Sequence, residues 1–198
     1  MLTPCHELIK EFSTRTTVPV ELDDVVEAIK KRGIKDEIWY FKADLDPSIV
    51  QAALVEWEYP DGFGRTKRVA HVDYAKSLPP DRQRLAVCKE LLHLLDPDEM
   101  KVSTEAEFEQ LVSRIGLPPE DQDPALDGHR TVSDYVGIYK AVAVLFPWAA
   151  REIFLPKFTD GTISHEDIAR IVDIPPRYAA LVMKEWWAKM HEILVKER

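Results

Sequence analysis

The chain has 198 residues, of which 45% are hydrophobic and 31% charged, a composition typical of a folded globular protein. Acidic residues outnumber basic residues by 35 to 26, which gives a formal net charge of −9. Such a field disfavours nucleic acid and anionic membranes as partners, and the densest basic group, RTKR at 65–68, is too short to reverse it. We therefore expect no nucleic-acid or membrane partner, and favour a partner that is basic or neutral.

The compartment can be predicted from cysteine usage and from the apolar segments. The chain contains two cysteines, Cys5 and Cys88, which do not form the framework of a disulfide-rich secreted protein. Its first residues lack the basic and apolar regions of a signal peptide, and no apolar stretch approaches the roughly 20 residues that span a bilayer. These features predict a cytoplasmic protein.

The first part of the chain is predicted to contain a helix followed by a small sheet. Apolar residues recur at helical spacing, and Gly33 is a natural stop for the helix that they predict. Later segments alternate between apolar and polar residues, and a turn at 60–64 joins two of them as a hairpin. The predicted elements are a helix at 20–32 and strands at 38–41, 49–59 and 67–74.

The rest of the chain is predicted to be helical. Helices are expected at 80–96, 105–115, 131–146, 164–172 and 176–195, with a loop or exposed insertion at 118–128. Ser164 and Asp167 form the pattern of a capping box, and Pro147 must kink or restart the chain after Phe146. The fold class predicted is α+β, with a small, at least partly antiparallel three-stranded sheet packed against a mostly helical body.

The helix at 80–96 carries one narrow polar strip. Apolar residues cover most of its circumference, and the ionisable side chains fall within an arc of roughly 120°. These side chains belong to Lys89, Glu90, His93 and Asp96. The pattern is that of a central helix that lines a cleft, and also that of any partly exposed helix.

The order of residues within the strip resembles a damaged HExxH zinc motif. In that motif two histidines at i and i+4 hold the metal, and the glutamate after the first one takes a proton from metal-bound water. Glu90 and His93 stand in the glutamate and second-histidine positions, whereas Lys89 replaces the first histidine. An ammonium has no lone pair to give a metal and repels a divalent cation. The motif therefore predicts the loss of the zinc site.

Three segments in the same order resemble ImmA/IrrE-type metallopeptidases. Residues 82–95 (RQRLAVCKELLHLL) resemble the family's R-F-T-x-A-H-E-L-G-H-L-L segment, and 149–156 (AAREIFLP) resemble its F-A-x-x-L-L-M-P helix end. Residues 168–175 (IARIVDIP) resemble the following IA-x-x-F-x-V-P segment. The resemblance implies a zincin-like core at 1–157, with an insertion at about 99–128, and a helical C-terminal segment at 158–198 packed on that core.

The resemblance also implies a third metal ligand, a glutamate about eleven residues before the proline that ends the second segment. Counting back from Pro156 gives Leu145, which cannot bind a metal, so His93 is the single surviving ligand. The helix at 133–146 contains one carboxylate, Asp134, and His129 is a further donor close to it in sequence. No bound cofactor is expected, and zinc is expected only if other ligands complete the site.

Further side chains are assigned to the same cleft. If zinc is absent, the ammonium of Lys89 takes roughly the metal's place and pairs with Glu90, Asp96 or another carboxylate; alternatively, it extends to the surface. His71 and Asp73 share one face of a strand, where they either orient a group in the cleft or are satisfied structural residues. The tryptophans Trp186 and Trp187 are predicted first as core and second as a docking surface.

Three functions remain open. The first is a non-catalytic pseudo-peptidase that acts by binding another protein, such as a transcriptional regulator, because family members resemble enzymes that cleave helix-turn-helix repressors in bacteria and phages. The second is an active metal-dependent peptidase with Glu90 as general base and non-standard metal ligands. The third is an accessory protein that shares only the scaffold. The sequence favours the first and leaves enzymatic activity undecided.

Overall fold

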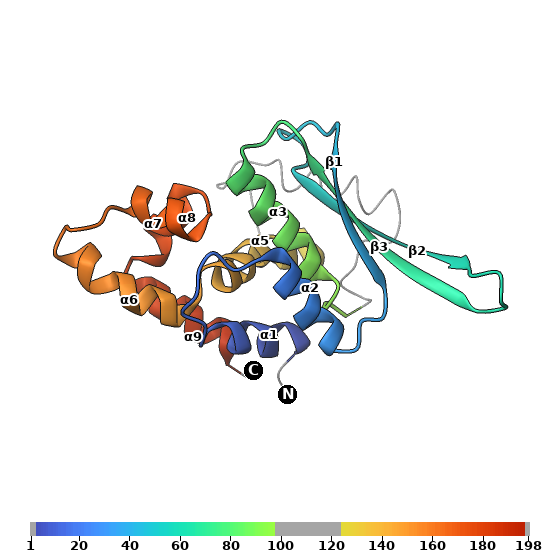
Figure 1. The fold of residues 1–198 in the computed structure, drawn as a ribbon, viewed down its shortest axis with the longest axis horizontal. Coiled ribbons are helices and arrows are strands. Elements are labelled where there is room, and N and C mark those ends of the chain that lie inside the picture. The colour runs from blue at the N-terminus through green and yellow to red at the C-terminus, as the bar shows by residue number, and fades with distance from the viewer. Residues whose placement is uncertain (1–2, 98–123, 197–198) are drawn as a thin grey trace.

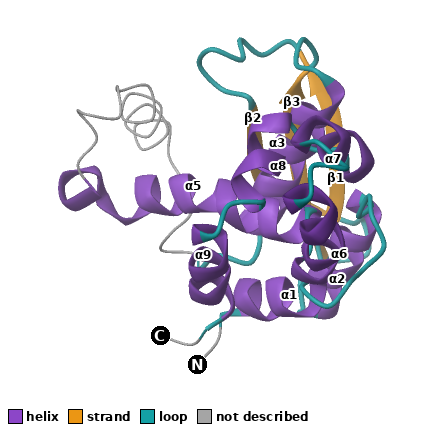
Figure 2. Ribbon diagram, turned by 90° about the vertical axis from the view of Figure 1, so that its left-hand side faces the viewer, coloured by secondary structure: helices purple, strands orange, loops and turns teal. Residues whose placement is uncertain are grey.

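The computed structural model describes residues 3–97 and 124–196, except for the side chains of 124–133. Within these residues the fold is α+β, with eight helices and a three-stranded mixed sheet packed against helices (Figures 1 and 2). The elements are α1 (Pro4–Phe12), α2 (Leu22–Lys31), β1 (Glu37–Ala43), β2 (Ala52–Pro60), β3 (Thr66–Ala75), α3 (Pro80–His93), α5 (Pro124–Leu145), α6 (Trp148–Thr159), α7 (His165–Val172), α8 (Pro176–Val182) and α9 (Trp186–Val195).

The sheet has the strand order β1-β3-β2, with β3 parallel to β1 and antiparallel to β2. The prediction of a small, partly antiparallel three-stranded sheet is therefore confirmed. The β2–β3 hairpin extends away from the helices (Figure 1). Its turn contains Gly62 and Gly64, both with a φ of +80°, a backbone conformation that glycine adopts without the strain that a side chain adds.

The two faces of the sheet differ because successive side chains in a strand point to opposite sides. Ala70 and Val72 of β3 are fully buried in the main core, on the inner face. Helix α3 packs against β2 and β3, and Tyr40 of β1 donates a hydrogen bond to Asp23 of α2. Helices therefore cover the inner face (Figure 1).

Helix α3 is the central helix that its apolar sequence predicts. Pro80 starts its first turn, and its buried side chains face neighbours on several sides. The guanidinium of Arg84, itself buried, donates hydrogen bonds to the carbonyls of Val20 and Asp173. These bonds connect α3 to the loop before α2 and to the turn between α7 and α8, so the helix is held in a fixed position.

The sequence pattern did not lead us to predict α1, although its signal is present. Thr3 caps this helix by accepting a hydrogen bond from the backbone N–H of His6, and Pro4 occupies the first turn. Its buried residues lie at positions 5, 8, 9 and 12, the spacing of one helical face. Charged residues lie between these positions, so the apolar periodicity of the segment is easily missed.

The limits of α5 correct part of the predicted loop at 118–128. The helix begins at Pro124, so residues 124–128 are helical, because proline is tolerated in a first turn where no backbone N–H is needed. Residues 118–123, the predicted helix at 105–115 and most of the predicted insertion at 99–128 lie outside the described residues. The restart after Phe146 is confirmed, since α6 begins at Trp148.

The prediction of one final helix at 176–195 is wrong. Two helices, α8 and α9, are separated at 183–185. Arg151, buried beneath the break, donates hydrogen bonds to the carbonyls of Val182 and Lys184 at 2.8 and 3.4 Å. A continuous helix would use these carbonyls for its own ladder, so the guanidinium stabilises the interruption.

Helix α7 begins with the predicted capping box, in which Ser164 and Asp167 exchange hydrogen bonds of 3.1 and 3.2 Å. The left-handed residue Asp173 ends it at a φ of 58°. In the part of the chain that the structure describes, no helix combines the length and apolar character required to cross a bilayer.

Candidate functional site

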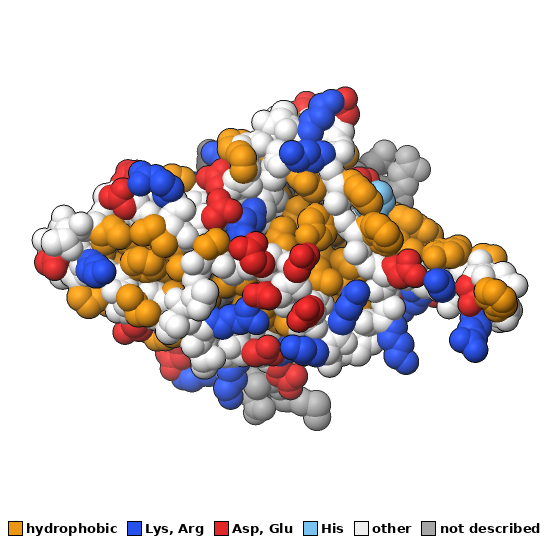
Figure 3. All heavy atoms as spheres, in the orientation of Figure 1, with side chains coloured by type: hydrophobic (Ala, Val, Ile, Leu, Met, Phe, Trp, Pro, Cys, Tyr) orange, Lys and Arg blue, Asp and Glu red, His pale blue; other side chains and the backbone are white. Residues whose placement is uncertain are grey.

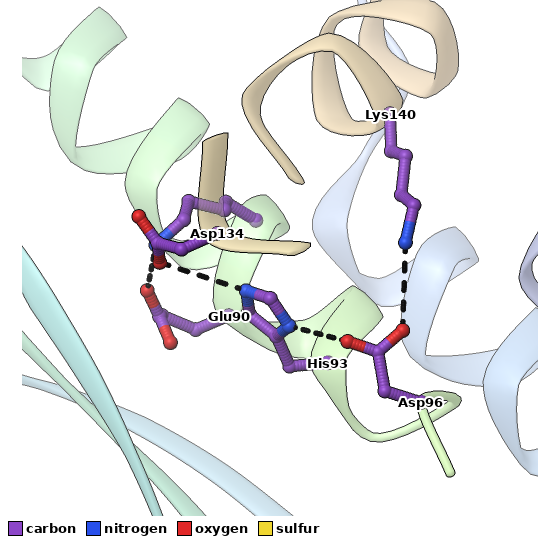
Figure 4. A network of polar contacts seen from close by, with 6 residues as sticks. Glu90, His93, Asp96, Asp134 and Lys140 are labelled. Carbon is purple, nitrogen blue, oxygen red and sulfur yellow. Dashed lines mark hydrogen bonds and ion pairs between the residues drawn. The ribbon is translucent and has the colours of Figure 1, made fainter. Parts of the chain in front are cut away.

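The polar strip of α3 faces α5, and the two helices enclose a cluster of charged side chains (Figure 4). Lys89, Glu90 and His93 come from α3, Asp134 and Lys140 from α5, and Asp96 from the turn after α3. We call these six residues the α3–α5 cluster. Their side chains are only 8% to 19% exposed, so the strip lies between packed helices.

Lys89 joins the two carboxylates of the cluster. Its Nζ lies 2.9 Å from Glu90 Oε1 and forms a second, close ion pair with Asp134. Burial acts to lower the pKa of Lys89, but the negative charges of Glu90 and Asp134 outweigh it and raise the pKa above its usual value. The side chain is therefore a permanent ammonium that points into the protein, and its partners are Glu90 and Asp134.

His93 is oriented by the carboxylate of Asp96. Its Nδ1 lies 2.7 Å from Asp96 Oδ2, and an ionised carboxylate only accepts, so Nδ1 carries the proton of this hydrogen bond. Nε2 then faces α5, 3.9 Å from Asp134 Oδ1. Lys140 lies 3.4 Å from the other Asp96 oxygen. Metal-binding histidines have the same carboxylate support, which fixes the ring and its tautomer.

Gly137 allows α5 to approach the strip. A Cβ at this position would lie 3.3 Å from His93 Nε2 and 3.3 Å from Lys89 Cγ, which is closer than ordinary van der Waals contact. Both side chains are held by their ion pairs, so neither can move freely. Glycine at this position thus allows Asp134, about one turn earlier on α5, to reach Lys89.

The cluster contains the donors of an incomplete metal site. One ligand atom from each of Glu90, His93 and Asp134 lies within 4.8 Å of the other two. These residues do not fit a zinc ion, however, because the ammonium of Lys89 already binds both carboxylates and would repel a dication there. Glu90 would also have to be both metal ligand and general base, two roles that the HExxH arrangement gives to different residues.

The resemblance pointed to Leu145 as the third-ligand position, and the structure places this residue, fully buried, in the main core. The carboxylate that α5 directs to the strip is Asp134, the one carboxylate that we noted in this helix. The side chain of His129 lies outside the described residues. The sequence did not lead us to Gly137 or Lys140, since neither residue type signals a site until the packing of α5 is known.

His71 and Asp73 lie on the opposite face of the sheet from Ala70 and Val72, and so do not join the α3–α5 cluster. His71 contacts Phe41 and Trp57 edge to face, at ring-centroid distances of 5.0 and 5.5 Å. Its Nε2 lies 3.1 Å from Asp73 Oδ1 but not in hydrogen-bonding geometry. The sequence assigns His71 and Asp73 to one cleft with Lys89. The structure does not bring them together, because the sheet lies between these two residues and the α3–α5 cluster.

No family model and no curated protein matches the sequence. The resemblance of the three segments to ImmA/IrrE-type metallopeptidases therefore stays a prediction from the sequence.

Proposed function

We propose that the protein is a non-catalytic pseudo-peptidase on a zincin-like scaffold, which acts by binding another protein. The observation that carries this proposal is the pair of ion pairs from Lys89 to Glu90 and Asp134. They put the single positive charge of an ammonium between the two carboxylates that a metal would otherwise bind. The site thus holds a cation, but not the Lewis acid on which the chemistry depends.

The arrangement of the other residues supports the same proposal. His93 keeps the carboxylate partner of a metal ligand in Asp96, although the position before Glu90 no longer supplies a ligand. Glu90, the residue that would act as general base, is engaged by an ammonium, and its side chain is 10% exposed. The resemblance adds the class of partner, a transcriptional regulator.

Metal analysis of three proteins tests the loss of the metal. After dialysis against zinc and then buffer, we expect the wild type and Lys89→Gln to hold less than about 0.1 equivalent of zinc, and Lys89→His about one equivalent. The Lys89→His change supplies the missing donor beside His93 and Asp134, whereas Lys89→Gln removes the ammonium without adding a strong ligand. About one equivalent of zinc in the wild type would contradict the proposal.

An active metal-dependent peptidase is the alternative, and the closeness of the Glu90, His93 and Asp134 donor atoms is the observation in its favour. A protease assay with an unfolded protein substrate separates the two functions. The pseudo-peptidase predicts equal, background rates for the wild type and Glu90→Gln, with or without added zinc. Cleavage by the wild type that Glu90→Gln abolishes would establish the alternative.

A further inference from the structure

The outer face of the sheet carries a cluster of exposed aromatic side chains. Trp39 and Phe41 of β1, Val55 and Trp57 of β2 and His71 of β3 point to this side, because the register pairs Trp39 and Val55 directly with His71. We call these five residues the outer-face patch. Hydrophobic side chains gather over the strands in the space-filling view (Figure 3).

The rings of this patch are ordered, although much of their surface is in solvent. Trp39 stacks on Phe41 with an interplanar angle of 11°, and Phe41 and Trp57 both contact the ring of His71. Trp39 is 51% exposed, Phe41 48% and Trp57 42%. Large aromatic side chains normally bury this surface, so a contiguous group left half-exposed indicates a contact surface.

The size of the patch argues against a second copy of the chain. Half-exposed aromatic rings of this kind, with Val55, offer roughly 300–400 Å² of apolar surface. A stable dimer of ordinary size buries about 800 Å² on each partner. The patch therefore matches the footprint of one short extended segment, laid across the strands.

The charges beside the outer-face patch indicate which kind of partner segment fits it. Asp73 lies directly opposite Phe41 in the register, on the same face as the rings. Among the ion pairs of the described residues its partner is His71, which has no permanent charge, whereas the nearby charges of Glu37 and Lys67 neutralise each other at 3.1 Å. The face thus presents aromatic rings beside a carboxylate, in a chain with a net charge of −9.

A cation over an aromatic ring is attracted by the electron-rich face of that ring, and tryptophan is the best partner. Arginine fits this surface better than lysine, since its planar guanidinium stacks on a ring while its N–H groups bind a carboxylate. A nucleic acid would also stack on the rings, but its phosphates would meet Asp73 and the acidic field of the chain.

We infer that the outer-face patch binds an arginine-containing, basic extended segment of a partner protein, whose guanidinium stacks on Trp39 or Trp57 and pairs with Asp73. The inference deepens the proposed function by naming the surface and the chemistry of the partner. The patch shares no residue with the α3–α5 cluster. The peptide titration and the metal analysis therefore test the inference and the proposed function separately.

The test is an NMR titration of the full chain with a capped peptide of alternating arginine and valine. We expect the indole N–H signals of Trp39 and Trp57, and the backbone N–H signals of the strands, which remain in every variant, to shift with a Kd on the order of 1 mM or tighter. The same peptide with citrulline in place of arginine keeps the planar shape of the side chain, but it lacks the charge and has a carbonyl oxygen in place of one donor nitrogen, and should bind at least about tenfold more weakly.

Variants locate the binding. Trp39→Ala with Trp57→Ala should weaken binding at least about tenfold, whereas Trp186→Ala, a matched change of a 40% exposed tryptophan on α9, should leave it unchanged. Asp73→Asn, which keeps every ring, should remove most of the preference for arginine over citrulline.

Three results would overturn the inference: equal binding of the two peptides, equal weakening by Trp186→Ala, or tighter binding of an oligouridylate than of the arginine peptide. The last result would assign the patch to single-stranded nucleic acid. Because Asp73→Asn leaves the aromatic packing intact, the charge requirement is tested even if the double tryptophan variant does not fold.

Discussion

The α3–α5 cluster and the outer-face patch lie on opposite sides of one sheet and differ in how they treat solvent. In the cluster, charged groups are withdrawn from solvent, and each acidic group contacts a basic one within the protein. On the outer face, aromatic rings remain in solvent, and among the ion pairs of the described residues the carboxylate of Asp73 beside them contacts only the imidazole of His71. Buried charges that contact lysine have little to offer a ligand, whereas exposed rings beside a carboxylate can bind a cation. The proposed recognition surface therefore lies on the sheet, on the other side from helix α3.

Removal of Lys89 is expected to have the largest effect on stability. Lys89→Met leaves the carboxylates of Glu90 and Asp134 facing each other in a buried site, which should lower the free energy of unfolding by about 3–5 kcal/mol. Urea denaturation at neutral pH measures it. The matched control is Lys76→Met, which breaks an exposed pair with Asp44 and should change stability by less than about 1 kcal/mol. Similar losses in both variants would show that the cluster is an ordinary set of surface charges.

Gly137→Ala should destabilise the protein by about 1 kcal/mol, although alanine is the better helix former, because the added Cβ crowds His93 and Lys89. The same change in a His93→Ala background has more room and should have a smaller effect or a stabilising one. Thermal unfolding of the four proteins gives the coupling between the two positions. An equal change in both backgrounds would mean that the close approach of α5 does not constrain the histidine ring.

His191 offers a contrast with the paired charges of the cluster, because it is a partly buried base whose Nε2 has no hydrogen-bond partner among the described residues. It stacks on Trp148 at 4.9 Å. Burial, and then the charge of Arg151, lower its pKa below the ordinary value. Below about pH 6.5, His191 therefore binds a proton more readily in the unfolded chain than in the folded chain. Its contribution to the free energy of unfolding is favourable above that pH and is lost as the pH falls.

The measurement is the free energy of unfolding between pH 7 and pH 5 for the wild type and His191→Phe, which keeps a ring against Trp148. The variant should lose less stability over this range, by an amount smaller than the loss caused by Lys89→Met. If the free energy of unfolding depends on pH in the same way in both proteins, His191 binds a proton equally well in the folded and unfolded chains.

Trp39→Thr should have the smallest effect, less than about 1 kcal/mol, because threonine suits a strand and the lost ring is half in solvent. The interior comparison is Trp187→Thr, which empties a fully buried position and should lower stability by about 3–5 kcal/mol. A large loss for Trp39→Thr would make the outer-face rings part of the stabilising core and remove the reason to expect a partner on them.

Much of the fold could be predicted from local patterns. β-branched and aromatic residues predicted the first strand, and alternation predicted the other two. The turn at 60–64 predicted the hairpin, and Ser164 with Asp167 predicted the start of α7, since each depends on neighbouring residues. The break between α8 and α9 could not be predicted in this way. It depends on Arg151, which is distant in sequence and binds the carbonyls of Val182 and Lys184 only after the helices pack.

The sequence by itself determined that a lysine precedes Glu90 at the position where a metal site of this spacing needs a histidine, and an ammonium has no lone pair to donate. It also predicted a central helix at 80–96, since apolar positions cover most of its circumference, and the structure confirms that helix as α3, which ends earlier, at His93. Only the tertiary structure decided that Asp134 meets Lys89, because this requires α5 to approach at Gly137. It also decided which side of the sheet His71 and Asp73 occupy: period-two alternation defines two faces, and the packing of α3 selects the one that is buried.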